Sequence, residues 1–198
     1  MTNSKSQTGI GSLIVFISLI LVAAMVGGIF IQSSSSLKSK ALATGNKAKQ
    51  QVTDSANILQ VYGKYSEGQG VSRINLIFMK TKLNAGSNSI KLTTSIIIIG
   101  TEDNVSEIIY NSSIDCDNNT NILANKNTAF GAKTSIGSNK DSEYIEKGEI
   151  VQICFALPNE ITESQKIKLN FIPKNSQIST IQFKTPDLIV TDRVALFP

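Results

Sequence analysis

The chain begins with a short polar segment, residues 1–6, and continues into a long uncharged and mostly apolar run from Ile10 to Ile31. Twenty-two residues at about 1.5 Å of helical rise each span about 33 Å, enough to cross the hydrocarbon core of a bilayer. The run contains 14 residues of the Ile, Leu, Val and Phe group. A cleavable secretory signal has a shorter apolar core with a small-residue cleavage site after it. We therefore expect the apolar segment to stay on the mature protein.

Helical spacing continues beyond the apolar run. Small and apolar residues recur at three- and four-residue steps at Leu37, Ala41, Gly45, Ala48, Val52, Ala56 and Leu59. Such spacing is typical of one apolar stripe on a helix. The sequence therefore predicts a single helix from about residue 10 to about residue 60, apolar all round in its first half and amphipathic in its second.

After Gly63 the period of the hydrophobic pattern changes to two, which is typical of half-buried β-strands. The clearest alternation is Lys166 to Phe171, and the run Ile96 to Ile99 is apolar on both faces, so we expect it to lie centrally in the fold. The other expected strands are Ile74–Met79, Ile90–Ile99, Ile108–Tyr110, Glu149–Leu157 and Thr180–Phe183.

Turn residues separate these expected strands at Asn84-Ala85-Gly86, Asn118-Asn119, Gly137-Ser138-Asn139 and Pro158-Asn159. Pro173 and Pro186 suit strand ends or edges. The predicted fold class is α+β, a long N-terminal hydrophobic helix followed by an all-β sandwich head. The expected organisation is a leader at 1–6, a helix at 7–60 and a head at 61–198.

The composition argues against catalysis and nucleic-acid binding. The chain has no histidine, so Ser-His and Cys-His nucleophile pairs and histidine-based zinc sites cannot form. The formal net charge is +4 and charges of both signs are dispersed, without the lysine and arginine cluster of a nucleic-acid footprint. We expect no enzyme activity, no cofactor and no nucleic-acid partner.

One polar cluster offers oxygen atoms at alternating positions. Asp115, Asp117, Asn119 and Asn121 have the spacing that begins a calcium loop, but the glycine and the distal glutamate of an EF-hand are missing. A solvated loop rich in Asp and Asn is the simpler interpretation, and calcium remains an open alternative.

The apolar segment carries a resemblance to a known family. Gly9-Ile10-Gly11-Ser12-Leu13-Ile14-Val15-Phe16-Ile17, followed by Leu21-Val22-Ala23-Ala24, resembles the N-terminal segment of archaellins over about fifteen positions. Archaellins are the filament subunits of the archaeal motility organelle and are related to type IV pilins. A fainter likeness occurs in the head at Leu83-Asn84-Ala85-Gly86-Ser87, Thr185-Pro186 and Val194-Ala195-Leu196.

The resemblance implies a structural subunit that sits in the cytoplasmic membrane before an assembly platform stacks it into a helical homo- or hetero-filament at the cell surface. The N-terminal helices would form the filament core and the heads its outer surface. The residues that we expect in this core are Gly9, Ile10, Gly11, Leu13, Ile14, Phe16, Ile17, Ala23, Ala24, Gly27 and Gly28. Small residues allow such helices to approach closely.

The resemblance also implies removal of a short leader by a membrane peptidase. Counting back two residues from Gly9 places the cut between Ser6 and Gln7. The sequence departs from the family here, because Ser6 stands where glycine is usual and Lys5 is the only basic residue of the leader. The departure puts the efficiency of cleavage in doubt.

Two kinds of covalent modification are expected in an exported head. Asn-x-Ser/Thr triplets at Asn104, Asn111 and Asn118 could accept N-glycans, which archaellins often carry. Cys116 and Cys154 could form a disulfide outside the cell membrane, or they could be two unrelated buried thiols. The sequence leaves both questions open.

Three alternatives to a motility filament remain. An adhesion pilin of the wider type IV pilin group would also polymerise, but bacterial-type pilins usually carry a glutamate where this chain has Gly11. The other two are a membrane-anchored extracellular binding module and an anchored monomer without a polymer.

Overall fold

The computed structural model describes residues 4–64, 73–102, 104–137, 143–189 and 191–197. The chain divides into two compact units, Met1–Ala48 and Lys49–Pro198. The described residues of the first unit are helical, and the second unit, which we call the head, contains the sheet.

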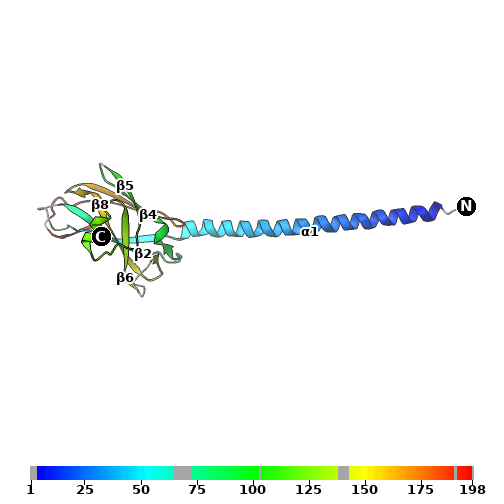
Figure 1. Ribbon diagram of the computed structural model, residues 1–198, viewed down its shortest axis with the longest axis horizontal. Coiled ribbons are helices and arrows are strands. Elements are labelled where there is room, and N and C mark those ends of the chain that lie inside the picture. Colours follow the sequence, from blue (N-terminus) through cyan, green and yellow to red (C-terminus); the bar gives the residue numbers. More distant parts are fainter. Residues whose placement is uncertain (1–3, 65–72, 103, 138–142, 190, 198) are drawn as a thin grey trace. The chain divides into compact units, whose positions relative to one another are not determined.

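Helix α1, Ser4–Thr53, is one continuous helix of 50 residues (Figure 1). The sequence correctly predicts its existence and its apolar first half. The predicted end near residue 60 is wrong, since α1 ends at Thr53 and strand β1 begins at Ala56.

The helix ends because the chain at residue 54 begins to bond with the head. The backbone N–H of Asp54 still donates to the carbonyl of Gln50 at 2.8 Å, but the carbonyl of Asp54 accepts from Gln177 at 2.8 Å. From Ala56 onward burial alternates, with Ala56 and Ile58 buried and Asn57 exposed between them. The three- and four-residue spacing that favoured helix is therefore compatible with a strand over its last positions, and burial in the sheet decides between the two.

The head is built mainly from strands. Their bounds are β1 Ala56–Lys64, β2 Ile74–Leu83, β3 Ile90–Lys91, β4 Ser95–Gly100, β5 Val105–Tyr110, β6 Ala129–Ile136, β7 Tyr144–Ile145, β8 Ile150–Ile161, β9 Lys166–Pro173, β10 Ser179–Lys184 and β11 Arg193–Phe197, with a 3₁₀ turn η1 at Leu92–Thr94 and a short helix α2 at Asn119–Ala124.

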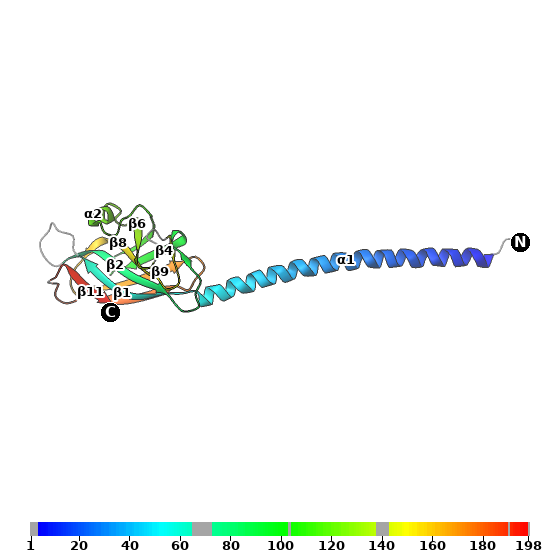
Figure 2. The ribbon, with the colours of Figure 1, turned by 90° about the horizontal axis from the view of Figure 1, so that it is seen from below.

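Among the described residues, nine of these strands form one hydrogen-bonded sheet in the order β10-β9-β4-β5-β6-β8-β2-β1-β11, and β3 pairs with β7 separately. All the neighbours in the large sheet are antiparallel except β5 and β6, whose parallel contact is limited to two residue pairs. We call β10-β9-β4-β5 the first half-sheet and β6-β8-β2-β1-β11 the second half-sheet. Figure 2 shows strands of both halves within the head.

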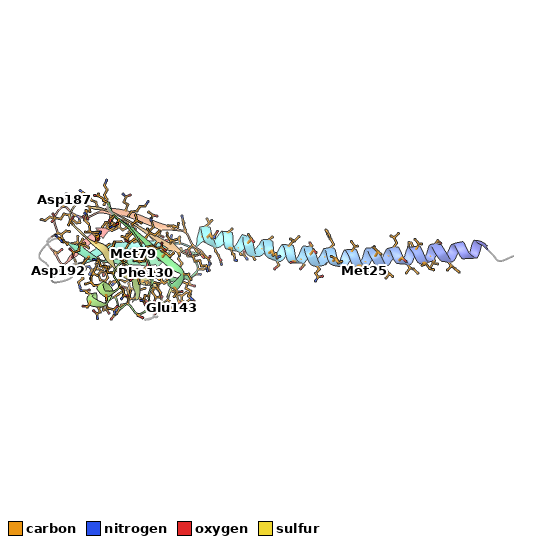
Figure 3. The ribbon with its side chains drawn as sticks, turned by 45° about the horizontal axis from the view of Figure 1, so that its top comes forward. Met25, Met79, Phe130, Glu143, Asp187 and Asp192 are labelled. Atoms are coloured by element: carbon orange, nitrogen blue, oxygen red, sulfur yellow. A yellow bond between two sulfur atoms is a disulfide. The ribbon has the colours of Figure 1, made fainter. Side chains whose placement is uncertain are left out.

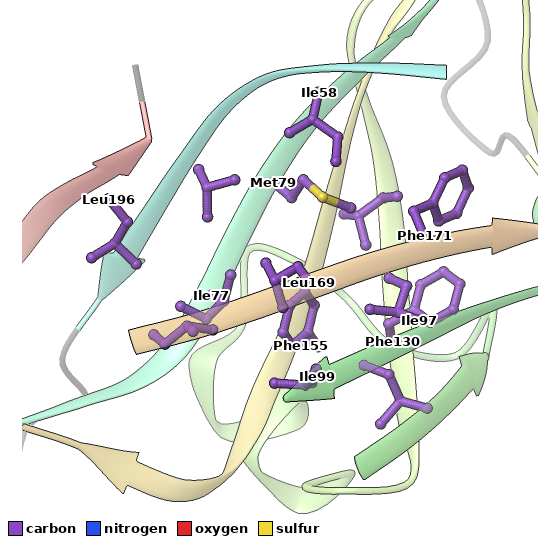
Figure 4. Close-up of a cluster of buried hydrophobic side chains, with 14 of the residues drawn as sticks. Ile58, Ile77, Met79, Ile97, Ile99, Phe130, Phe155, Leu169, Phe171 and Leu196 are labelled. Atoms are coloured by element: carbon purple, nitrogen blue, oxygen red, sulfur yellow. The ribbon is translucent and has the colours of Figure 1, made fainter. Parts of the chain in front are cut away.

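The core lies between the two half-sheets, as a sandwich requires. Buried side chains from β4 and β9, such as Ile97 and Phe171, belong to the same cluster as Met79 of β2 and Phe155 of β8 (Figure 4). The predicted sandwich head is thus confirmed in its architecture.

Several strand boundaries differ from the prediction. The run Ile90–Ile99 is divided by the turn η1. The isoleucines at 96–99 lie in β4, which pairs with a strand on each side. Ile97 and Ile99 are fully buried, whereas Ile96 and Ile98 are half-buried. One face of β4 meets the core and the other faces outward.

Two predicted turns are also wrong. Asn118-Asn119 begins helix α2, because the side-chain oxygen of Asn118 accepts from the N–H groups of Thr120 and Asn121 and caps the helix. Pro158-Asn159 lies inside β8, where the pairing with β2 shifts register between Ile74 and Leu76. Such an irregularity tolerates proline, which has no N–H to donate. Of the predicted turn at Gly137-Ser138-Asn139, the last two residues lie outside the described residues.

Candidate functional site: the apolar surface of α1

The candidate site is the surface of α1 itself. Every described side chain from residue 9 to residue 53 is exposed within the single chain. The exposed fractions of the large apolar side chains in the first part range from 49% at Ile17 to 75% at Phe30. Figure 3 shows these side chains, including Met25, projecting along the length of the helix. A soluble chain rarely leaves so large an apolar surface uncovered, so this surface needs a partner or a lipid phase.

The serines within the apolar segment are adapted to a dry environment. The hydroxyl of Ser12 donates to the carbonyl of Gly9 at 2.9 Å, and that of Ser18 donates to the carbonyl of Ile14 at 2.8 Å. Each hydroxyl is satisfied one turn back on its own helix. The segment can therefore enter lipid or a bundle of helices without leaving these donors unpaired.

No contact within the single chain requires glycine at the glycine positions of α1. A Cβ atom added at Gly9, Gly11, Gly27 or Gly28 would meet nothing within 4 Å. Ala23 and Gly27, like Ala24 and Gly28, are spaced four residues apart, which places each pair of small residues on one face. This spacing permits close approach by another helix.

By length and composition, the helix from Gly9 to Thr53 could cross a membrane. The predicted filament-core residues all lie in this part of α1. Ser6 and Gln7, the predicted cleavage site, lie in the first turns of α1, and residues 1–3 of the leader lie outside the described residues. The cut itself stays a prediction.

In the head, Cys116 and Cys154 form a disulfide with their Cα atoms 5.6 Å apart. Of the two interpretations of the cysteines, the bridge is the one that the structure has. It connects the loop before α2 to β8 and spans 38 residues of sequence.

The bridge holds the segment around α2 over a second apolar cluster, which the sequence analysis did not predict. This cluster lies on the face of the second half-sheet that points away from the main core and combines Phe78 of β2 and Ala156 of β8 with Ile114 and Ile122 of the covering segment. The signal for the covering helix was available in the sequence, since Asn118 is a favourable N-cap residue directly before a helix-forming stretch.

The polar cluster proposed as a calcium site uses its oxygens within the loop. Asp115 Oδ1 accepts from the N–H of Asp117 at 2.9 Å, and Asn121 Oδ1 accepts from the N–H of Asp115 at 3.2 Å. Asp117 Oδ2 pairs with the ammonium of Lys133 on β6, and the pKa of Lys133 is raised chiefly by this hydrogen bond. Asn119 lies at the start of α2. Within the described parts of the chain, no three His, Cys, Asp or Glu side chains gather into a metal-binding group.

The three glycosylation triplets lie on the surface of the head to different degrees. Asn104 and Asn118 are exposed and Asn111 is half-buried. Asn111 Oδ1 accepts from the N–H of Ser113 at 2.9 Å, and Asn118 Oδ1 accepts from that of Thr120 at 3.1 Å. In both residues the side-chain oxygen accepts this hydrogen bond. The side-chain nitrogen, to which a glycan would be attached, takes no part in it.

An uncovered apolar helix with a sandwich head defines the class of filament subunits and membrane-anchored modules. The model of the archaeal-type flagellin family matches residues 6–183, so the chain belongs to that family. It is 31% identical to flagellin A2 of Halobacterium salinarum over 76% of this chain and 72% of that one. It is also 34% identical to flagellin B3 of the same organism over 56% of this chain and 55% of the relative, so this match spans about half the length of the relative.

The fold resembles that of a solved filament protein. A chain from the archaeal flagellum of Methanospirillum hungatei matches with a TM-score of 0.68 at 15% sequence identity, covering 96% of this chain and 99% of that one. At this identity the likeness establishes the fold, including the long N-terminal helix.

Proposed function

We propose that this chain is a structural, non-enzymatic subunit of the archaeal flagellum, the archaellum, and polymerises through α1 into a filament for swimming. The observation that carries this proposal is the apolar surface of α1 between Ile10 and Ile31, which is exposed in the single chain. Membership of the archaeal-type flagellin family supports it.

The physics of α1 suits two successive environments. Before assembly, the uncharged segment is favourable in the cytoplasmic membrane, where leucine, isoleucine, valine and phenylalanine each contribute about −0.3 to −0.6 kcal/mol. In the filament, copies of α1 replace the lipid. This exchange changes the hydrophobic free energy little, so close packing at the small residues and between identical side chains determines assembly. Contacts between identical subunits that do not close into a ring produce an open helical polymer.

Maturation by a leader peptidase, followed by insertion through a membrane assembly platform, belongs to the same proposal. The leader contains Lys5, a charged group that would be costly to bury in an apolar filament core. Cleavage between Ser6 and Gln7 would remove it. N-terminal peptide mass spectrometry of purified filaments should find chains that begin at Gln7, and chains that retain Met1 to Ser6 would refute this maturation step.

N-glycosylation of the head is proposed for at least one of Asn104, Asn111 and Asn118. Glycopeptide mass spectrometry of sheared filaments should find added sugar mass on a peptide that contains one of them. Removal of that asparagine by replacement with glutamine should remove the mass. We propose no cofactor for the chain.

The central test is electron microscopy of material sheared from the cell surface, with mass spectrometry of its subunits. The proposal expects filaments that contain this chain, and a deletion strain that lacks them and does not swim in soft agar. Filaments whose loss abolishes attachment but not swimming would indicate an adhesion pilin. A chain found only in the membrane, without filaments, would indicate an anchored binding module or monomer.

A further inference from the structure

The outer face of the first half-sheet carries a row of isoleucines. Ile96 of β4 lies opposite Ile109 of β5 on one side and Ile172 of β9 on the other. Continuing the register of β9 and β10, in which Phe171 lies opposite Ser179, places Ile178 next to Ile172. Burial alternates along these strands, so these isoleucines face away from the core, and Ile109 and Ile178 are 57% and 54% exposed. We call these four residues the isoleucine row.

The surroundings of the isoleucine row are basic. Lys168 on the outward side of β9 and Lys174 just beyond its end are exposed, and they lie four residues before and two residues after Ile172. Glu107 on β5 is the acidic residue of the same outward face within the described strands of this half-sheet. A partner that fits this surface therefore has an apolar side chain accompanied by carboxylates.

The same chain presents such a surface in the segment after β10. Leu188 is 70% exposed and has Asp187 beside it, and Asp192 follows a few residues later. Figure 3 shows Asp187 and Asp192 at the same end of the head. We call Asp187 and Leu188 the Leu188 knob.

The Leu188 knob is held in place by bonds to the preceding turn. Asp187 accepts hydrogen bonds from the hydroxyl of Ser164 and, at 3.2 Å, from the ammonium of Lys184. The N–H of Ile189 donates to Glu163 at 3.2 Å. A loop fixed in this way loses little conformational entropy when its exposed apolar side chain is bound.

The isoleucine row and the Leu188 knob cannot meet within one head. The knob bonds to the turn before β9, whereas Ile172 lies six residues along that strand, about 20 Å away at 3.3 Å per residue. Both surfaces are apolar, the isoleucine row has lysines near it, and the Leu188 knob includes a carboxylate. The two surfaces are separated along the strand direction. They suit contact between one head and the next.

We propose that the isoleucine row of one subunit binds the Leu188 knob of a second copy of this chain. Four isoleucines, two of them already half-buried, fall well short of the roughly 800 Å² per partner of a stable independent interface. The contact therefore suits partners that are already held together, as copies joined through α1 would be, and not a protein captured from dilute solution. The inference rests on the proposed filament function, because the filament provides this tethering.

The test is cysteine crosslinking in filaments that carry Ile172→Cys together with Leu188→Cys. The native bridge between Cys116 and Cys154 is buried and stays intact under mild oxidation. We expect a ladder of dimers and higher oligomers on a non-reducing gel from the double variant and none from either single variant. The matched control is Val105→Cys with Leu188→Cys, because Val105 is 75% exposed on the same face but lies opposite Gly100, away from the isoleucine row.

Each other outcome overturns the inference in a recognisable way. Filaments of normal appearance without a ladder would reject the contact and leave the proposed function intact. Dimers from Ile172→Cys alone would mean that the isoleucine row packs on its own copy, and an equal ladder from the Val105 control would mean random collision. Absence of filaments from the unaltered chain would reject the proposed function and this contact with it.

Discussion

The carboxylate of Asp54 is bound by Asn88 at the point where the helix ends and the sheet begins. Asp54 Oδ1 accepts from the backbone N–H of Asn88 at 2.8 Å and from its side-chain amide at 3.2 Å, and Oδ2 accepts from the same amide at 3.2 Å. Asp54 is only 6% exposed. Asp54, the first residue after α1, therefore holds the loop between β2 and β3 in place through Asn88.

Replacement of Asp54 by alanine should destabilise the head. Hydrogen bonds to a charged group contribute about 1.5–3 kcal/mol, so we expect Asp54→Ala to lower the free energy of unfolding by about 2 kcal/mol. Chemical denaturation of the full chain in detergent, followed by near-ultraviolet circular dichroism, measures the change. Asp54→Asn keeps an acceptor for the Asn88 N–H and should cost less. Equal losses in both variants would contradict the assigned role of the hydrogen bonds to Asn88.

Loss of the disulfide should release the segment around α2. A bridge that closes 38 residues stabilises a fold by about 4 kcal/mol in the chain-entropy model, so Cys116→Ser with Cys154→Ser should lower the free energy of unfolding by an amount of that order. Intact-mass measurement of the native protein, with and without reductant before alkylation, checks the bridge directly. Two thiols alkylated without reductant would contradict it.

A charge in the middle of the apolar segment should abolish assembly. Ile17→Lys places an ammonium in the part of α1 that, in the proposed function, enters lipid and then a bundle of helices, at a cost of about 3 kcal/mol for insertion alone. We expect no filaments in micrographs of sheared cell-surface material. Ile17→Leu keeps the site apolar and should assemble normally. Normal filaments from the lysine variant would exclude α1 as the filament core.

The hydrogen bonds that hold the Leu188 knob in place should weaken at acid pH. The Ser164 hydroxyl, and then Lys184, hold the pKa of Asp187 below its ordinary value of 3.8. Because the folded pKa is the lower one, the stabilisation by Asp187 is present above the ordinary value and is lost as the pH falls through the lowered pKa. Carbon-13 NMR titration of the Asp187 carboxyl measures its pKa in the folded protein. Ser164→Ala should raise the pKa toward 3.8, whereas Ser164→Thr keeps the hydroxyl and should raise it less. An unchanged pKa in Ser164→Ala would show that the Ser164 hydroxyl does not cause the shift.

Local patterns in the sequence were sufficient where burial follows a single period. The alternation from Lys166 to Phe171 predicts β9, and the uncharged run from Ile10 to Ile31 predicts the exposed apolar part of α1. The predicted end of the helix was wrong, because the helical period and the strand period both fit the few residues there. Ala56 and Leu59 continue a helical stripe, yet burial of Ile58 and Val61 against β2 makes this segment a strand.

The sequence is sufficient to predict a membrane-length apolar helix followed by a β-rich head, because hydrophobic periodicity is a local property of the chain. It also determined the family, through the residues around Gly9 to Ala24. Three features required the three-dimensional structure: the bridge between the two cysteines, the second apolar cluster covered by the segment around α2, and the row formed by Ile109, Ile96 and Ile172. Those features depend on strand order and register between residues far apart in the chain, and no local pattern encodes the register.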